Sequence, residues 1–284
     1  MIELDAATVL LQWATGGLFF LWVTSRRREV GIGYGWLLRG TYLVMAVAAI
    51  GIGVRVDPVP LRDAASAAVA LGAGVALVVS IVRRRAGVLH ERERVAARSA
   101  RVAAMTGIDR AATGPAEGAA EFSPALDLIA PAAGLAGLVA AGVHAGSPEL
   151  LAVARTLAGA AFLGAVCDAM LLGHWYLVQP GLARGPLLEL VRWVGALWPV
   201  EVATMLWPTG MVSVLIGAID DGYGGLLGWF WVACACMTIV LVVVTRAALR
   251  ERAYSAVMAA TGLLYLAILT AFGTDLVARA VLAR

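Results

Sequence analysis

In the stretch Phe162-Leu163-Gly164-Ala165-Val166-Cys167-Asp168-Ala169-Met170-Leu171-Leu172-Gly173-His174-Trp175-Tyr176, two ionisable residues, Asp168 and His174, stand inside an otherwise apolar run. A helix of about 20 mainly apolar residues can cross a bilayer, and residues 149–178 and 185–218 are both predicted to do so. They fold back on each other at Gln179-Pro180-Gly181. A charge inside lipid costs several kcal/mol and usually marks function. We therefore expect the functional region in this helical hairpin.

The second helix of the hairpin carries Glu189, Arg192 and Glu201 between tryptophans. When residues are counted outward from the turn, His174 lies level with Glu189, and Arg192 lies within about one helical turn of Asp168. The spacing therefore predicts an Asp168–Arg192 ion pair across the hairpin. Glu201 lies on the opposite face of its helix from Arg192, and deeper in the bilayer. We expect Asp168 and Glu201 to face one interior cavity that is reached from the cytoplasmic side.

The composition indicates an integral membrane protein. Of the 284 residues, 61% are hydrophobic and 14% are charged, against roughly 45–50% and about 25% in soluble domains. We expect one membrane domain over residues 1–284, without a separate soluble catalytic domain. All 22 basic residues are Arg, and without Lys the chain has neither a Schiff-base lysine nor the lysine of a phosphate-binding loop. The net charge of +3 is spread along loops and does not indicate nucleic-acid binding.

The predicted fold is all-α, a polytopic membrane protein with eight transmembrane helices. The candidate spans are 6–24, 34–55, 63–83, 124–145, 149–178, 185–218, 224–247 and 254–278. Cytoplasmic loops are enriched in positive charge, and the arginine clusters follow the first, third, fifth and seventh spans. Both termini are therefore predicted on the non-cytoplasmic side. The bias toward Ala, Arg, Gly and Val is typical of a GC-rich bacterial genome, which predicts a bacterial cytoplasmic (inner) membrane.

Three further charged features have local explanations. Arg39 lies in the cytoplasmic third of the second span, where it either extends to the interface or adds a positive charge to the hairpin site. Asp127 lies in the first turns of its helix, where the helix dipole favours an acid. Asp275 and Arg279 lie one turn apart near the outer surface and are expected to form an i, i+4 ion pair.

Residues 84–122 form the one long loop, which is expected on the cytoplasmic side. Val88, Val95 and Val102 recur every seven residues among arginines, which predicts an amphipathic helix over 84–105. Such a helix can lie on anionic lipid or dock a partner protein; a solvated extension of the third span is the alternative. Residues 106–120 are rich in Gly, Pro and Ala and indicate a flexible linker.

No metal site and no cofactor ligand set is evident in the sequence. The three cysteines lie inside predicted spans. Cys234 and Cys236 are about 200° apart on a helix, so they neither chelate one metal nor form a disulfide with each other. His144 and His174 are predicted near opposite membrane faces, which excludes a bis-histidine haem. A quinone needs no such ligands and is compatible with the charged hairpin.

Three functions fit these features. Asp168, His174, Glu189 and Arg192, with Glu201 deeper, provide the histidine and carboxylates that a quinol needs to lose protons. The leading hypothesis is therefore a membrane subunit that handles quinone or relays protons, with electrons supplied by a partner protein. Embedded charges and proline-kinked helices suit a secondary transporter of a small substrate equally well. The third hypothesis is a non-catalytic scaffold or assembly subunit whose charges pair internally, and the sequence leaves open whether the chain is an enzyme.

Overall fold

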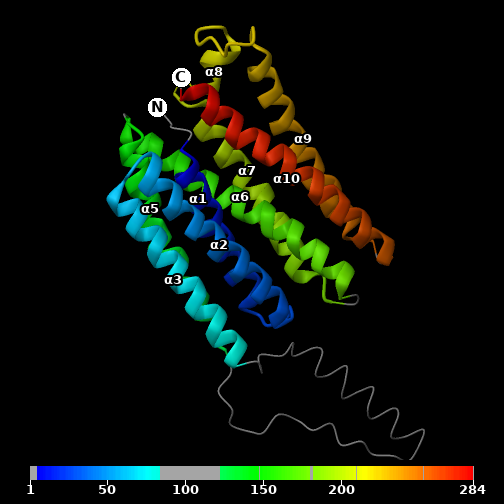
Figure 1. The fold of residues 1–284 in the computed structure, drawn as a ribbon. Coiled ribbons are helices and arrows are strands. Elements are labelled where there is room, and N and C mark those ends of the chain that lie inside the picture. Colours follow the sequence, from blue (N-terminus) through cyan, green and yellow to red (C-terminus); the bar gives the residue numbers. More distant parts are fainter. Residues whose placement is uncertain are drawn as a thin grey trace, which may run out of the picture.

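The computed structural model is a bundle of long helices (Figure 1). It describes residues 5–83, 122–146, 148–179, 182–208, 210–251 and 253–283. Its helices are α1 (Ala6–Ser25), α2 (Ile32–Val56), α3 (Pro60–Val82), the 3-10 helix η1 (Pro124–Leu128), α5 (Ile129–His144), α6 (Glu149–Val178), α7 (Gly185–Leu206), α8 (Gly210–Leu215), α9 (Leu226–Ala248) and α10 (Tyr254–Leu282). No strand occurs in these ranges, so the all-α prediction is confirmed. The helix predicted over 84–105 and the linker over 106–120 lie outside the described residues.

Within the described residues, seven helical segments are long and apolar enough to cross a membrane, which indicates a multi-pass membrane protein. They are α1, α2, α3, α6, α9, α10 and the segment Pro124–His144, which joins η1 to α5. Helix α7 is not among them because Glu189, Arg192 and Glu201 all fall within its 22 residues.

The prediction of one continuous helix over 185–218 is wrong. Helix α7 ends at Leu206, and the short helix α8 begins at Gly210. Pro208 lies between them, and proline has no backbone N–H with which to continue a helix. The break occurs about two thirds of the way along the predicted span and separates the charged part of the segment from an apolar remainder.

The helices of the bundle have two ends, which we name after their loops. At the arginine end α1, α3, α6 and α9 finish, and α2, η1, α7 and α10 begin. Its loops carry Arg26, Arg27, Arg28, Arg83, Arg184 and Arg250. At the opposite, aspartate end the loops carry Asp5, Asp57, Asp220 and Asp221. Figure 1 shows the N and C labels close together at the aspartate end.

Helices α1 and α6 form the centre of the bundle. Two thirds of the apolar window of each is buried (67%), against 33% for α2, α3 and α10. Helix α6 contacts α1 and α5 on one side and α7 and α10 on the other. Small residues allow α1 and α6 to approach closely, since a Cβ atom placed on Gly16 would lie 1.8 Å from the backbone oxygen of Ala160. The polar side chains of these two helices are therefore held in fixed positions.

We expect Gly16→Ala to lower the free energy of unfolding by about 1–3 kcal/mol, because the added methyl group overpacks the α1–α6 contact. Gly262→Ala is the matched control: Gly262 is also helical, but a Cβ atom there meets nothing within 4 Å. Its substitution is expected to be neutral or stabilising, since Ala is the better helix former. Unfolding of both variants in detergent micelles measures the difference. Equal stabilities would contradict the close contact.

Asp221 shapes the loop that leads into α9. Its Oδ1 atom accepts hydrogen bonds from the backbone N–H groups of Tyr223 and Gly225, both at 2.9 Å, and its Oδ2 atom accepts one from Leu227 at 2.8 Å. These donors, Gly225 foremost, lower the pKa of the Asp221 carboxyl below its ordinary value. The ionised carboxylate thus holds the first turn of α9 in place.

The stabilising effect of Asp221 should depend on pH. Because its pKa is lowered in the folded protein, the contribution is fully present above the unfolded value of about 4 and is lost as the pH falls through the lowered folded pKa. We expect Asp221→Asn to increase amide hydrogen exchange at Gly225 and Leu227 at neutral pH, and to remove most of its acid dependence. Asp220→Asn is the control, because among the described residues Asp220 accepts a hydrogen bond from the N–H of Gly222 alone. Similar exchange in both variants would contradict this assignment.

Candidate functional site

Asp168 lies fully buried in α6, with 0% exposure. The Tyr42 hydroxyl on α2 donates to its Oδ1 atom, and the Tyr34 hydroxyl donates to its backbone oxygen at 3.2 Å. The Oδ2 atom has no hydrogen-bond partner among the described residues. Asp168 is therefore held by two tyrosines and keeps one unpaired oxygen.

The prediction that Asp168 pairs with Arg192 is wrong. Arg192 is exposed, and no ion pair of Arg192 occurs in the described ranges. Its neighbours Val191 and Val194 are buried, so the inward face of α7 at this level is apolar. Counting from the turn gives the depth of a residue but not the rotation of α7 about its own axis, and Arg192 lies on the exposed face.

Arg39 binds Asp127 in a bidentate ion pair. Its Nε atom lies 2.7 Å from Oδ1, and its Nη2 atom lies 2.7 Å from Oδ2. Both side chains are buried, and the Phe122 ring covers the guanidinium at 4.4 Å. Arg39 thus neither extends to the interface nor joins the hairpin site, and the helix dipole alone does not account for Asp127. The ion pair links η1 to α2.

His174 and Glu189 each have a partner outside the hairpin. The exposed His174 places its Nδ1 atom 3.1 Å from the Tyr265 hydroxyl on α10. Glu189 binds Arg26 and Arg27 at the end of α1. The structure therefore does not bring Asp168, His174, Glu189 and Arg192 together as one cluster.

Glu201 belongs to a second buried group, which we name the Glu201 cluster: Glu201 on α7, Arg155 on α6, and Asp275 and Arg279 on α10. All four are at most 4% exposed, and Asp275, Arg279 and Arg155 act electrostatically on Glu201. Neither carboxylate oxygen of Glu201 meets an N–H or O–H donor among the described residues, and its hydrogen-bonding neighbour is the Asp275 carboxyl group. Two acids and two arginines from three helices thus meet inside the bundle.

The two arginines of the cluster are anchored. The Nε atom of Arg279 lies 2.8 Å from Oδ2 of Asp275, and its Nη2 atom donates to the Arg155 backbone oxygen at 3.2 Å. Arg155 donates to the backbone oxygens of Thr204 and Trp207, at 2.9 and 2.8 Å. These are carbonyls freed where α7 ends, so Arg155 satisfies the broken end of that helix.

Sequence reasoning missed this cluster, although a signal was present. Arg155 lies six residues after the start of α6 at Glu149, Glu201 lies five before the end of α7 at Leu206, and Arg279 lies three before the end of α10. All three therefore lie within about two turns of the aspartate end.

The Asp275–Arg279 pair was expected and is confirmed, but as a buried pair and not as a surface one.

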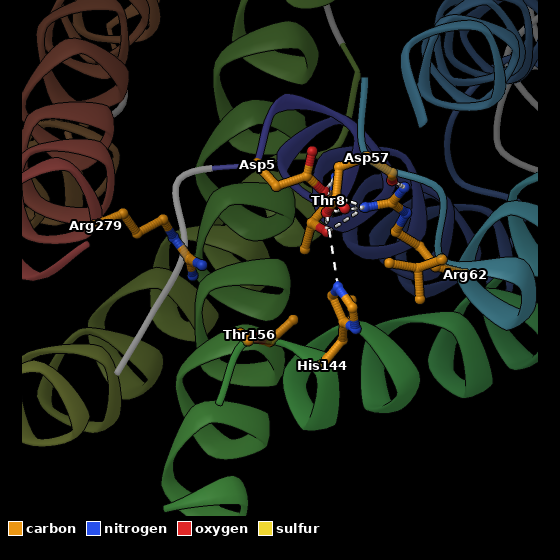
Figure 2. A pocket seen from close by; sticks show the side chains of 10 residues that line it. Asp5, Thr8, Asp57, Arg62, His144, Thr156 and Arg279 are labelled. Carbon is orange, nitrogen blue, oxygen red and sulfur yellow. Dashed lines mark hydrogen bonds and ion pairs between the residues drawn. The ribbon is translucent and has the colours of Figure 1, made fainter. Parts of the chain in front are cut away.

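A small polar cavity lies at the aspartate end, and Arg279 of the Glu201 cluster lines it (Figure 2). Its volume is about 10 Å³, room for roughly one water molecule. Arg279 and Thr156 line its inner wall, while His144 and Asp57, with side chains 51% and 42% exposed, lie at its mouth. Figure 2 shows the Arg62 guanidinium beside Asp5 and Asp57, and Arg62 forms an ion pair with Asp5. Arg279 is thus shared by the cavity and the cluster.

The expectation that Asp168 and Glu201 share one cavity is wrong. Both are fully buried, as expected of interior groups. Asp168, however, lies 13 residues beyond Arg155 on α6, which is about 20 Å along the helix, whereas Glu201 interacts with Arg155 itself. The two carboxylates therefore belong to separate sites, one near the aspartate end and one nearer the arginine end.

An apolar groove runs between α1, α5 and α6. It has a volume of about 440 Å³, and Thr15, Gly16, Phe19, Pro131, Leu135 and Leu157 are among the residues that line it. Thr15 carries the one side-chain polar group of the lining. Gln12 lies one turn before Gly16, and its Nε2 atom donates to the Thr156 backbone oxygen at 2.6 Å. The groove thus lies beside the polar residues that lead to the Glu201 cluster.

Comparisons of this chain with protein-family models, with curated proteins and with solved structures found no match. The functional conclusion therefore depends on the chemistry of these buried groups.

Proposed function

We propose that this chain is a membrane protein that relays protons through the Glu201 cluster and handles a lipid-soluble carrier such as quinone. The observation that carries the proposal is Glu201 itself: a carboxyl group with 0% exposure that meets no N–H or O–H donor among the described residues and whose hydrogen-bonding neighbour is a second carboxyl group, that of Asp275. Buried ionisable groups of this kind in membrane helices are typical of proton relays and ion pathways.

The charges of the cluster suit a group that gains and loses a proton. Arg155 and Arg279 remain charged, and Asp275 is paired with Arg279. The net charge of the cluster is therefore +1 with Glu201 protonated and 0 with Glu201 ionised. Neither state leaves a large uncompensated charge in the bundle, so Glu201 can alternate between them. The polar cavity at the aspartate end supplies the route for protons, past His144 and along Thr156 and Arg279.

The apolar groove supports the quinone part of the proposal. Its volume of about 440 Å³ lies within the range of roughly 300–1,000 Å³ for small-molecule sites, which are mostly apolar with few polar groups. Thr15 provides such a group, and Gln12 and Thr156 connect this region to the polar cavity. A carrier in the groove would lie beside the proton route.

We further propose eight spans, with both termini on the non-cytoplasmic side of a bacterial inner membrane. The support is that α7 lies alongside α6 and α9, together with the loop arginines, which gather where α1, α3, α6 and α9 end. The arginine end is then cytoplasmic, and the polar cavity opens to the other side.

A secondary transporter is the second candidate, favoured by the break between α7 and α8. Transporters often place substrate sites where discontinuous helices expose carbonyls to buried charges, and Arg155 binds the Thr204 and Trp207 carbonyls at this break. A scaffold subunit, the third hypothesis, would need neither proton movement nor a bound carrier.

The test combines two measurements on the full chain. Lipid extracts of gently purified protein are analysed by mass spectrometry for quinone, and proteoliposomes with an internal pH dye are followed after a pH jump, with and without a short-chain quinol. Bound quinone and proton flux above that of protein-free liposomes support the proposal. Flux without quinone favours the transporter, and the absence of both would leave the scaffold and overturn the proposal.

A further inference from the structure

Asp275 has an oxygen atom that its ion pair with Arg279 leaves unused. The Asp275 side chain is 0% exposed, and its Oδ2 atom lies 2.8 Å from the Nε atom of Arg279. Its Oδ1 atom is buried and meets no hydrogen-bond donor among the described residues. A buried acceptor without a donor is costly. The i, i+4 ion pair therefore accounts for only one of the two Asp275 oxygens.

The group that faces this carboxyl is a second acid. Asp275 and Glu201 are hydrogen-bonding neighbours, and neither Glu201 oxygen meets an N–H or O–H donor in the described part of the chain. Two ionised carboxylates cannot hydrogen-bond to each other, because each is only an acceptor. A single proton between them converts one of the two into a donor, as in other pairs of adjacent carboxyl groups. One proton would thus satisfy both acids.

The unused Asp275 oxygen lies over Gly159 on α6, beside residues of the polar cavity. A Cβ atom placed on that glycine would lie 2.6 Å from Asp275 Oδ1 and from Arg279 Nη2, and 3.0 Å from Gln12 Nε2. Arg279 lines the polar cavity. Gln12 donates a hydrogen bond to the backbone oxygen of Thr156, which also lines it. Asp275 therefore contacts Glu201 and also lies next to the cavity wall.

We propose that Glu201 and Asp275 share one proton, and that Asp275 carries it between Glu201 and the polar cavity. This inference rests on the proposed function, in which protons pass through the Glu201 cluster. The proton leaves the Glu201 carboxyl as Asp275 Oδ1 accepts it, while Oδ2 keeps its bond to Arg279. It then passes to water in the cavity, which leaves both acids ionised. Arg155 and Arg279 balance the two negative charges of that state, so the net charge of the cluster goes from +1 to 0.

Infrared difference spectra of the full chain test the shared proton without requiring proton flux. A protonated carboxyl group and a carboxylate absorb at separate wavenumbers, so each variant shows which form it has removed. Glu201→Gln and Asp275→Asn each keep the net charge of the cluster at +1, with a single ionised acid beside the two arginines. We therefore expect each variant at neutral pH to lose the signal of one protonated carboxyl group relative to the wild type. Glu189→Gln is the control, because Glu189 is ion-paired with Arg26 and Arg27 and should lose a carboxylate signal.

A protonated-carboxyl signal that is lost in Glu201→Gln but retained in Asp275→Asn would mean that Glu201 holds the proton alone, and would overturn the proposal. Proton flux into proteoliposomes tests the carrier role. Asp275→Asn is expected to lower the flux about 10²-fold, as for a positioned acid or base, and wild-type flux in this variant would contradict that role. If the wild type shows no flux, the proposed function fails and the carrier role with it, but the spectra still decide whether the two acids share a proton.

Gly159→Ala decides the question if Asp275→Asn does not fold. This variant keeps every charged group, and its methyl group displaces Asp275 Oδ1, Arg279 Nη2 and Gln12 Nε2, which are the ends of flexible side chains. We expect the protonated-carboxyl signal to shift and the flux to fall about tenfold, because the two acids no longer meet in the same geometry. Gly262→Ala is the matched control, since a Cβ atom there meets nothing within 4 Å. An unchanged spectrum and flux in Gly159→Ala would overturn the proposal.

Discussion

Glu201→Gln is expected to lower proton flux through reconstituted protein by about 10²-fold, the lower end of what a positioned acid or base contributes. Gln has nearly the same shape as Glu but does not gain and lose a proton near neutral pH. Neither Glu201 oxygen accepts a hydrogen bond from a donor among the described residues, and the Gln amide can donate to the neighbouring Asp275 carboxylate as a protonated Glu201 would. It also leaves the cluster with a net charge of +1, the charge it has when Glu201 is protonated. We therefore expect the variant to fold while losing its flux.

Glu189→Gln is the matched control for this experiment. Glu189 lies on the same helix but forms ion pairs with Arg26 and Arg27 near the arginine end. The Glu189 side chain is 17% exposed. Its substitution is expected to change flux less than twofold. Flux is measured from an internal pH dye after a pH jump, with equal amounts of folded protein in each sample. Wild-type flux in Glu201→Gln would remove Glu201 from the proton route.

The length of each apolar run predicts most of the helices well, because crossing a bilayer imposes a minimum length on every span. The helix predicted over 149–178 is observed with the same bounds, as α6 (Glu149–Val178). The break after Leu206 was not predicted, although Pro208 is visible in the sequence. Proline often kinks a helix without ending it, and here the carbonyls at the break are satisfied by Arg155, whose position depends on the packing of α6.

The partners of the buried charges were harder to predict than the helices. Counting residues from a turn gives depth, but the face that each residue presents depends on how every neighbouring helix packs. Counting placed Arg192 at the level of Asp168, but Arg192 is exposed, and the Tyr42 hydroxyl on α2 donates the hydrogen bond to Asp168 instead. Glu201 was correctly expected to face the interior, but its neighbours come from α6 and α10. Helix rotation is a property of the whole bundle, and hence it was not available from any one span.

Asp127→Leu is expected to lower the free energy of unfolding by about 3–5 kcal/mol, because it leaves the Arg39 guanidinium buried without its carboxylate. Arg39 is 2% exposed, and two of its nitrogens lie 2.7 Å from the Asp127 oxygens. The remaining contact, with the Phe122 ring at 4.4 Å, is a cation–π interaction worth roughly 0.5–2 kcal/mol and does not replace the lost ion pair. The measurement is unfolding in mixed micelles, followed by circular dichroism.

The double variant Arg39→Met with Asp127→Leu separates the value of the pair from the cost of breaking it. Replacing both members of a buried ion pair by apolar residues is often neutral or stabilising, so the double variant is expected to recover most of the stability lost in Asp127→Leu. Recovered stability would show that the fold does not require the ion pair itself. A double variant as unstable as the single one would instead mean that the pair fastens η1 to α2 in a way that apolar contacts do not replace.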